Sequence, residues 1–519
     1  MYQKNTLSQR ALNQKTTMKS ISKKVPVVLL FSVLFTLLFF QKLIGINLLI
    51  FESILLLLAS WLYKPKFNSL LSKSLLAGTI LTLIFVVIHN SLISKVVNSA
   101  SFLLLISNLI SLDFTHIKSY LFQFIYTIYE GIHAFINDLF NSKKIRFFYY
   151  FKIIGIPLLL ILFFFIIYYN SNTYFAEITD KFFKKIETFW DWIPSINISL
   201  FLTFIVGLIL SIVLFYQKTY LVAKQKEAQL SLVMKRRRIP LRKRNFLALK
   251  SEYRSGIFLL ICLNILLLVF NYSDVSTVWF SYEWNGGYLK NFVHQGTYLL
   301  ISSLIASICI ALYFFRGNLN FYSKNRLLKV LTYIWLSQNL LLIFSLFIRN
   351  TIYINHFSLA YKRIGVYAFL LATIIGIITI LIKVQKKKSA FYIVKNNTFS
   401  IYFILVSLCF VNWDVFIAKY NLNSYDESFI ELSFLTELSN KALPYVNLNH
   451  EKLSKLETQQ AKSFSFSSRS YYMDKTTYKK KMENKIAYFL DSYPDRSWLE
   501  WNYSDYRAYH LLKNDAYEK

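Results

Sequence analysis

Long apolar blocks set narrow limits on the fold of this sequence. A helix needs about 20 mostly apolar residues to cross the roughly 30 Å of hydrocarbon in a bilayer. About eleven blocks approach that length, at residues 25–40, 43–62, 75–92, 97–112, 153–169, 196–216, 256–272, 297–315, 328–348, 364–382 and 399–411. Because 55% of the 519 residues are hydrophobic, the chain has more apolar surface than a soluble domain could bury. We therefore predict an all-α fold, a polytopic transmembrane helix bundle with a small helical extramembrane region at the carboxyl terminus.

A strongly basic loop at residues 217–255 separates two of these blocks. Cytoplasmic loops of membrane proteins carry an excess of Lys and Arg, so we expect this loop in the cytoplasm. Counting crossings outward gives a cytoplasmic amino terminus and an extracytoplasmic carboxyl-terminal tail, and one miscounted helix would move the tail to the other side. The densest part of the loop is a basic run formed by Lys235, Arg236, Arg237, Arg238, Arg242, Lys243 and Arg244.

The basic run and the net charge of +32 bear on the partners of the chain. In a soluble protein such a charge would indicate nucleic acid. Here the run lies between two apolar blocks, which hold it close to lipid headgroups. We therefore predict that it binds the surface of the lipid bilayer through anionic lipids, and that the chain binds no nucleic acid.

The chain divides into five parts by composition. These are a cytoplasmic segment at 1–24, an amino-terminal transmembrane half at 25–216, the basic loop at 217–255, a carboxyl-terminal transmembrane half at 256–412 and the tail at 413–519. In the first half, stretches 114–140 and 174–192 mix apolar and charged residues at helical spacing. This pattern predicts helices that lie along the membrane interface.

The tail is rich in charged residues and Tyr, and it predicts a helical appendage that is too short to promise a core of its own. Residues 424–427 and 497–500 have the pattern of a capping box, which opens a helix, and Pro444 is expected to end the first of these helices. A further helix between them is predicted by an apolar face formed by Tyr478, Met482, Ile486 and Phe489. We expect that a membrane or periplasmic protein partner, if there is one, binds through this tail.

Acidic residues are scarce in the apolar blocks, and between Glu283 and Asp414 the sequence has none. Glu52 lies near the middle of block 43–62, where a charged side chain costs about 3 kcal/mol on insertion scales. Two interpretations stay open, a proton- or cation-coupled site or a buried carboxyl that is hydrogen-bonded to a neighbouring helix. In both cases we expect the Glu52 side chain to face other helices.

Basic residues gather at the expected outer ends of the second-half helices. They are His294, Arg349, His356, Lys362 and Arg363. An anionic headgroup or a lipid-linked phosphate could bind to this basic set. The alternative is that the set pairs with acidic residues of the tail, such as Asp414, Asp426, Glu427 and Glu431.

The sequence has no pattern that indicates a catalytic, metal or cofactor site. It contains no phosphate-binding glycine loop, no zinc-protease motif, no serine-hydrolase elbow and no dinucleotide fingerprint. Its three cysteines, Cys262, Cys309 and Cys409, fall in apolar blocks without metal-ligand spacing. We expect no cofactor and no metal.

Four strings in the second half resemble a family of bacterial integral membrane proteins that is known only as a domain of unknown function and is common in Bacteroidetes. The strings are FVHQGTY at 292–298, YFFRGN at 313–318, LAYKRIGV at 359–366, and VNWD at 411–414 with IAKYNL at 417–422. The resemblance covers about 264–444 and is less clear in the first half. It implies an inner-membrane location and brings no activity, cofactor or catalytic residue.

Three functions are compatible with these observations. The first is a non-enzymatic membrane component, and the second is a transporter or lipid-handling protein for an anionic substrate that uses Glu52 and the basic set. The third is a membrane glycosyltransferase, although the first external loop lacks the acidic residue that such an enzyme would use there. We rank them in this order.

Overall fold

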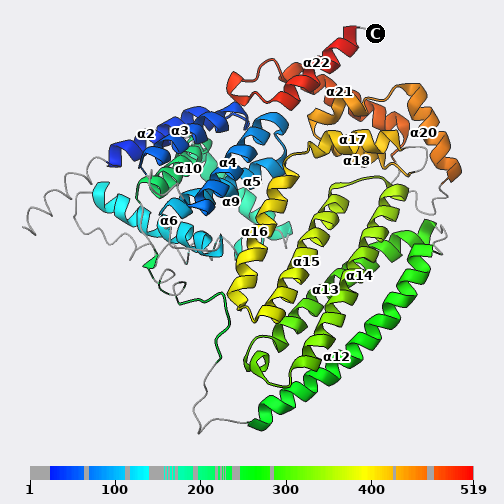
Figure 1. Ribbon diagram of the computed structural model, residues 1–519. Coiled ribbons are helices and arrows are strands. Elements are labelled where there is room, and N and C mark those ends of the chain that lie inside the picture. The colour runs from blue at the N-terminus through cyan, green and yellow to red at the C-terminus, as the bar shows by residue number, and fades with distance from the viewer. Residues whose placement is uncertain are drawn as a thin grey trace, which may run out of the picture. The chain divides into compact units, whose positions relative to one another are not determined.

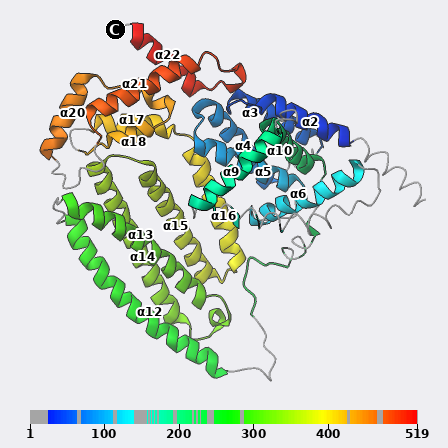
Figure 2. The ribbon, with the colours of Figure 1, turned by 180° about the vertical axis from the view of Figure 1, so that it is seen from behind.

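The computed structural model describes residues 24–62, 69–110, 117–139, 173–190, 197–216, 229–236, 246–280, 286–424, 428–463 and 473–517, with a few separate positions between 157 and 227. Within these residues the chain is built from helices, as Figure 1 and the reverse view in Figure 2 show. The β-type pairing in this part is one isolated bridge between Val233 and Lys388. The prediction of an all-α helix bundle is confirmed.

Eight helices of the described part are long and apolar enough to cross a membrane. They are α4 (Leu70–His89), α5 (Leu92–Ile110), α10 (Ile198–Phe215), α12 (Phe246–Asp274), α13 (Gly286–Phe314), α14 (Arg326–Phe357), α15 (Tyr361–Lys386) and α16 (Ala390–Leu408). The shorter apolar helices α2 (Lys24–Phe39) and α3 (Ile46–Leu62) coincide with the first two predicted blocks. Most of the predicted block 153–169 lies outside the described residues. The chain is a multi-pass membrane protein.

The chain forms two compact units, and the first contains α2, α3, α6 (Ile117–Leu139), α9 (Thr173–Trp190) and α10. Helices α2 and α10 pack closely because Gly207 has no side chain. A Cβ atom at Gly207 would lie 2.8 Å from the Cβ of Phe35. Val28 of α2 and Ile212 of α10 are buried in one cluster with Phe135 of α6. A small residue at the interface is what allows two apolar helices to approach each other in a membrane.

Helices α6 and α9 coincide with the two stretches expected at the membrane interface. On α9, Tyr174, Ile178 and Phe182 follow at four-residue spacing, and their exposed fractions are 77%, 67% and 59%. Residues four apart share one face of a helix. This exposed apolar stripe is typical of a helix that lies in the interface, and the interfacial position stays a prediction.

The second unit contains a bundle of the five helices α12 to α16. Helix α14 packs against α12, α13 and α15, and its residues Leu336, Leu342 and Leu346 are fully buried in the shared core. Helix α12 continues past its last regular turn as a π-helix at Val275–Phe280. The turn from α4 to α5 also belongs to this unit and lies beside the end of α16, where the rings of Phe85 and Phe410 are 4.5 Å apart.

The tail forms the remaining part of the second unit. Its helices are α17 (Trp413–Asn423), α18 (Leu432–Glu437), α19 (Leu443–Val446), α20 (His450–Ser463), α21 (Lys475–Ser492) and α22 (Tyr503–Tyr517). They enclose a core that includes Ile417, Tyr478 and Phe489 and extends to Ile354 and Leu359 at the turn between α14 and α15. The tail was expected to be too short to promise a core of its own, and in the structure the ends of two bundle helices complete its core.

The local predictions for the tail have mixed outcomes. Helix α21 buries Tyr478, Met482 and Phe489 as its apolar face predicts. Pro444 was expected to end a helix, but it lies in the first turn of α19, where proline is tolerated because no backbone N–H is needed. The box at 497–500 forms a 3-10 turn instead of opening the last helix, and residues 425–427 of the other box lie outside the described residues.

Candidate functional site

Glu52 lies on α3 in the first unit, and its exposed fraction is 4%. Its neighbours in sequence, Phe51 and Leu55, are also buried, and the ring of Phe51 lies 5.1 Å from that of Phe35 on α2. The Glu52 side chain is therefore enclosed by protein. The choice between a coupling site and a structural carboxyl stays open.

The structure gives Arg349 a partner that the sequence interpretation missed. Arg349 of α14 forms an ion pair with Asp274 at the end of α12, and Ser345 donates a hydrogen bond to the same carboxylate. The exposed fractions of Arg349 and Asp274 are 5% and 4%. The candidate membrane helix around α12 continues to Phe280 and so includes Asp274, a buried carboxylate in addition to Glu52.

The described members of the basic set have partners or surroundings that differ from those of Arg349. Arg363 donates hydrogen bonds to the carbonyl oxygens of Phe357, at 2.6 Å, and of Ser358, so its charge lies at the carboxyl-terminal end of α14. Cations stabilise a helix at this end because the last carbonyl groups carry partial negative charge. Lys362 is exposed, and His356 is half-buried at the last turn of α14. His294 belongs to α13, but its side chain lies outside the described part.

Of the tail acids that were considered as partners for the basic set, Glu431 attracts Arg363 electrostatically, and the described acids also accept hydrogen bonds from other groups. Asp414 accepts hydrogen bonds from the hydroxyl of Tyr361 and, at 3.4 Å, from the N–H of Ser439. The Glu431 side chain accepts a hydrogen bond of 2.9 Å from Ser433. Asp426 and Glu427 lie outside the described residues. An anion site formed by the whole basic set stays a prediction.

The structure describes two residues of the basic run, Lys235 and Arg236. The other five lie outside the described residues, namely Arg237, Arg238, Arg242, Lys243 and Arg244. The preceding segment is attached to the turn between α15 and α16. Met234 N–H donates to Lys387 O at 2.9 Å, and Ser389 N–H donates to Leu232 O at 3.0 Å. These bonds hold the two described basic residues beside the exposed Lys386 and Lys387.

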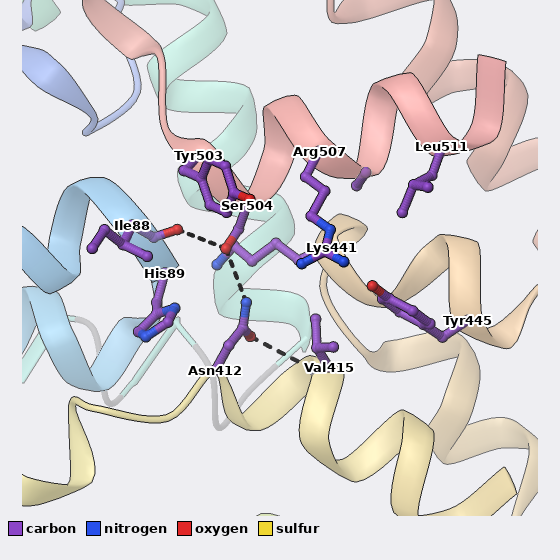
Figure 3. A pocket seen from close by; sticks show the side chains of 11 residues that line it. Ile88, His89, Asn412, Val415, Lys441, Tyr445, Tyr503, Ser504, Arg507 and Leu511 are labelled. Atoms are coloured by element: carbon purple, nitrogen blue, oxygen red, sulfur yellow. Dashed lines mark hydrogen bonds between the residues drawn. The ribbon is translucent and has the colours of Figure 1, made fainter. Parts of the chain in front are cut away.

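A small cavity of about 130 Å³ lies where the tail meets the end of α4. Ile88 and His89 of α4, Asn412 before α17, Lys441 before α19, and Ser504 and Arg507 of α22 all line it (Figure 3). Three of these six residues are basic, and the lining includes no Asp or Glu among the described residues. The cavity is the strongest candidate site in the described part of the chain because its walls combine cations with hydrogen-bonding groups.

Hydrogen bonds fix the polar side of this cavity. Ser504 donates to the carbonyl oxygen of Ile88 at 2.7 Å and is 3.0 Å from the Asn412 side-chain nitrogen, as the dashed lines in Figure 3 show. His89 Nε2 lies 3.1 Å from the carbonyl oxygen of Phe410, so this nitrogen carries the proton and donates. Helices α4 and α22 and the loop before α17 are thus joined by polar contacts at the cavity wall.

Lys441 provides the most enclosed charge of the cavity. Its Nζ donates to the carbonyl oxygen of Asn90 at 2.7 Å, and its exposed fraction is 7%. Burial lowers the pKa of Lys441, and the more distant carboxylates of Asp505 and Asp414 oppose this shift. Both carboxylates have closer partners, since Asp505 is 3.1 Å from Arg496 and Asp414 accepts from Tyr361. The positive charge of Lys441 is therefore not neutralised by direct contact.

The comparisons with known proteins identify the family. A family model described as Domain of unknown function (DUF4153) matches residues 27–448. The chain belongs to this family. The DUF4153 match begins at the first apolar helix, so it extends well beyond the expected resemblance at 264–444. No curated protein matches the chain, and no solved structure matches it.

The DUF4153 match includes His89 and Lys441 of the cavity but ends before Ser504 and Arg507. Sequence analysis missed all of these cavity residues because they are separated by long intervals along the chain. One signal was available at Lys441, a charged residue that directly precedes the apolar pair Ala442 and Leu443. A lysine in such a position is rarely buried without a polar partner.

Proposed function

We propose that the chain is a non-enzymatic component of a bacterial inner membrane that holds its tail on the extracytoplasmic side. The observation that carries this proposal is the shared core of the tail and the bundle. Ile354 and Leu359, at the turn between α14 and α15, are buried with tail residues. Asn421 also exchanges two hydrogen bonds with the backbone of Leu359, of 2.7 and 3.0 Å. A domain attached in this way has a fixed position relative to the bundle.

The charge distribution supports the orientation. The tail packs at the amino-terminal end of α15, whereas the turn that follows α15 carries Lys386, Lys387 and Lys388 and binds the segment before the basic run. The two ends of one straight helix lie on opposite sides of a membrane that it crosses. Because Lys and Arg concentrate in cytoplasmic loops, the basic end belongs in the cytoplasm and the tail outside it. Anionic lipids of the inner leaflet are then the partners of the basic run.

Cysteine labelling tests this orientation. In a variant that lacks Cys262, Cys309 and Cys409, single cysteines replace Lys480 on α21 or Lys387 in the turn after α15, both of which are exposed. A membrane-impermeant maleimide applied to spheroplasts is expected to label the cysteine at 480. The cysteine at 387 is expected to react after the membrane is permeabilised. Reversed labelling, or labelling of both positions from one side, would show that the proposed orientation is wrong.

A further inference from the structure

We propose that the cavity between the tail and α4 binds a phosphate group, held by Arg507 and Lys441. This proposal goes beyond the scaffold role and does not depend on the orientation of the chain in the membrane. Two basic residues, Lys441 and Arg507, line a cavity of about 130 Å³, and like charges that line one cavity repel each other unless an anion lies between them.

Lys441 and Arg507 have N–H donors that a ligand could use. An ammonium group has three N–H donors, and the structure assigns one donor of Lys441 to the carbonyl oxygen of Asn90. Arg507 makes no ion pair with any residue in the described part of the chain. A guanidinium group offers five donors in a planar fork that matches two oxygens of a phosphate. Together these donors suit a group with several acceptor oxygens.

The neighbouring carboxylates do not occupy these donors. Asp505 lies on the same helix as Arg507, but its carboxylate accepts from Arg496 at 3.1 Å and from the Asn502 side chain at 3.0 Å, and its backbone N–H donates to the Asn502 side-chain oxygen at 2.9 Å. Asp414 is engaged by Tyr361. An anion that enters the cavity would therefore replace water on Lys441 and Arg507 without displacing a carboxylate.

The size and position of the cavity narrow the ligand class. The volume of about 130 Å³ is sufficient for several water molecules, and hence for a single tetrahedral oxyanion. Ile88 and His89 are the last turn of α4, so the cavity lies where this span reaches the membrane surface. The phosphate of a lipid headgroup lies at this depth, and free phosphate has the same charged oxygens.

Calorimetric titration of the full-length protein with inorganic phosphate, in a neutral detergent and phosphate-free buffer, tests the site. Arg507→Ala and Lys441→Met are each expected to weaken phosphate binding about tenfold or more, because each removes charge-assisted hydrogen bonds. Lys513→Ala is the matched control, since it removes one exposed charge from the same helix outside the cavity. It is expected to change the affinity by less than about twofold.

The source of the phosphate is decided by a second measurement. Native mass spectrometry after addition of phosphatidylglycerol reports whether a lipid stays bound, and whether Arg507→Ala removes it. Lipid retention that depends on Arg507 assigns the cavity to a headgroup, whereas calorimetric binding without such retention assigns it to free phosphate. If Lys441→Met does not fold, Arg507→Ala still decides the question because its side chain is exposed. The proposal is overturned if neither ligand binds, or if Arg507→Ala and Lys513→Ala behave alike.

Discussion

Arg349 and Asp274 form a buried ion pair across the interface of α14 and α12. A polar series continues along the same interface, since the Gln338 side chain donates to that of Asn264 at 2.9 Å and the Asn271 side chain donates to Gln338 O at 3.2 Å. Polar contacts between apolar helices fix their relative register, because a shift along the axis would leave buried polar groups without partners. The ion pair is the most strongly charged contact of this series.

Removing the acidic partner is expected to destabilise the bundle. In Asp274→Asn, the buried guanidinium of Arg349 loses its counter-charge, and breaking a buried pair in this way costs about 3–5 kcal/mol. The measurement is the free energy of unfolding of the detergent-solubilised protein in a denaturant titration. The double variant Asp274→Leu with Arg349→Met is expected to regain most of the loss, because no buried charge remains.

An exposed pair on the tail provides the control for this experiment. Lys479 and Glu483 lie 3.7 Å apart on α21, with exposed side-chain fractions of 47% and 61%. Glu483→Gln should cost less than about 1 kcal/mol. If Asp274→Asn costs no more than this control, the buried pair does not hold α12 and α14 together.

The close approach of α2 and α10 should depend on Gly207. In Gly207→Ala, the new methyl group would lie 2.8 Å from the Cβ of Phe35, so the helices must separate, at a cost of about 1–3 kcal/mol. Gly376→Ala on α15 is the matched control because a Cβ there meets no atom within 4 Å. The control should be neutral or stabilising, since Ala favours a helix more than Gly does. Thermal unfolding of both variants checks this, and equal midpoints would contradict the prediction.

Apolar length was sufficient to predict the fold class and most helices, but not where each span ends. The block that became α12 loses its apolar character after Tyr272, and the helix nevertheless continues through Asp274 because Arg349 and Ser345 satisfy that carboxylate. The partner lies on another helix, so local sequence carries no sign of it. The core of the tail escaped prediction for the same reason, since Ile354 and Leu359 contribute to it from the bundle.

The residues of the candidate site were harder to predict from the sequence than the fold was. The basic set was predicted from residues that share the expected outer helix ends, and the structure instead assigns Arg349 to Asp274 and Arg363 to the end of α14. The cavity draws His89, Lys441 and Arg507 from three separate elements. Hydrophobic periodicity locates helices but says little about which polar side chains meet when those helices pack.

The basic run is expected to select anionic lipid. Lys235 and Arg236 are held beside Lys386 and Lys387 by the backbone hydrogen bonds of the preceding segment. In the double variant Lys235→Gln with Arg236→Gln, the preference for phosphatidylglycerol over phosphatidylcholine should fall by about 1 kcal/mol per residue. Lipid titration monitored by native mass spectrometry measures this preference. Lys479→Gln with Lys480→Gln on α21 controls for the loss of two charges, and an equal effect of both double variants would count against a lipid-binding role of the run.

Because of Lys441, alkaline pH should raise the free energy of unfolding and weaken the binding of phosphate. Burial lowers the pKa of Lys441 below its ordinary value of 10.5, with Asp505 and Asp414 opposing the shift. The folded chain therefore releases this proton at a lower pH than the unfolded chain does. As pH rises through the folded pKa toward 10.5, the unfolded state binds more protons, so the contribution of Lys441 to the free energy of unfolding increases. Over the same interval the cavity loses a positive charge, and phosphate binding should weaken.

Paired titrations of the wild type and Lys441→Met separate this effect from other ionising groups. The difference in unfolding free energy between the two proteins should shift in favour of the wild type as pH rises through the lowered pKa of Lys441 toward 10.5, because only the wild type is relieved of a buried charge. The affinity of the wild type for phosphate should fall over that range, while the residual affinity of Lys441→Met changes less. Phosphate itself keeps a nearly constant charge there, since its second ionisation is complete at lower pH. Parallel curves for the two proteins in both measurements would mean that Lys441 does not titrate at the cavity.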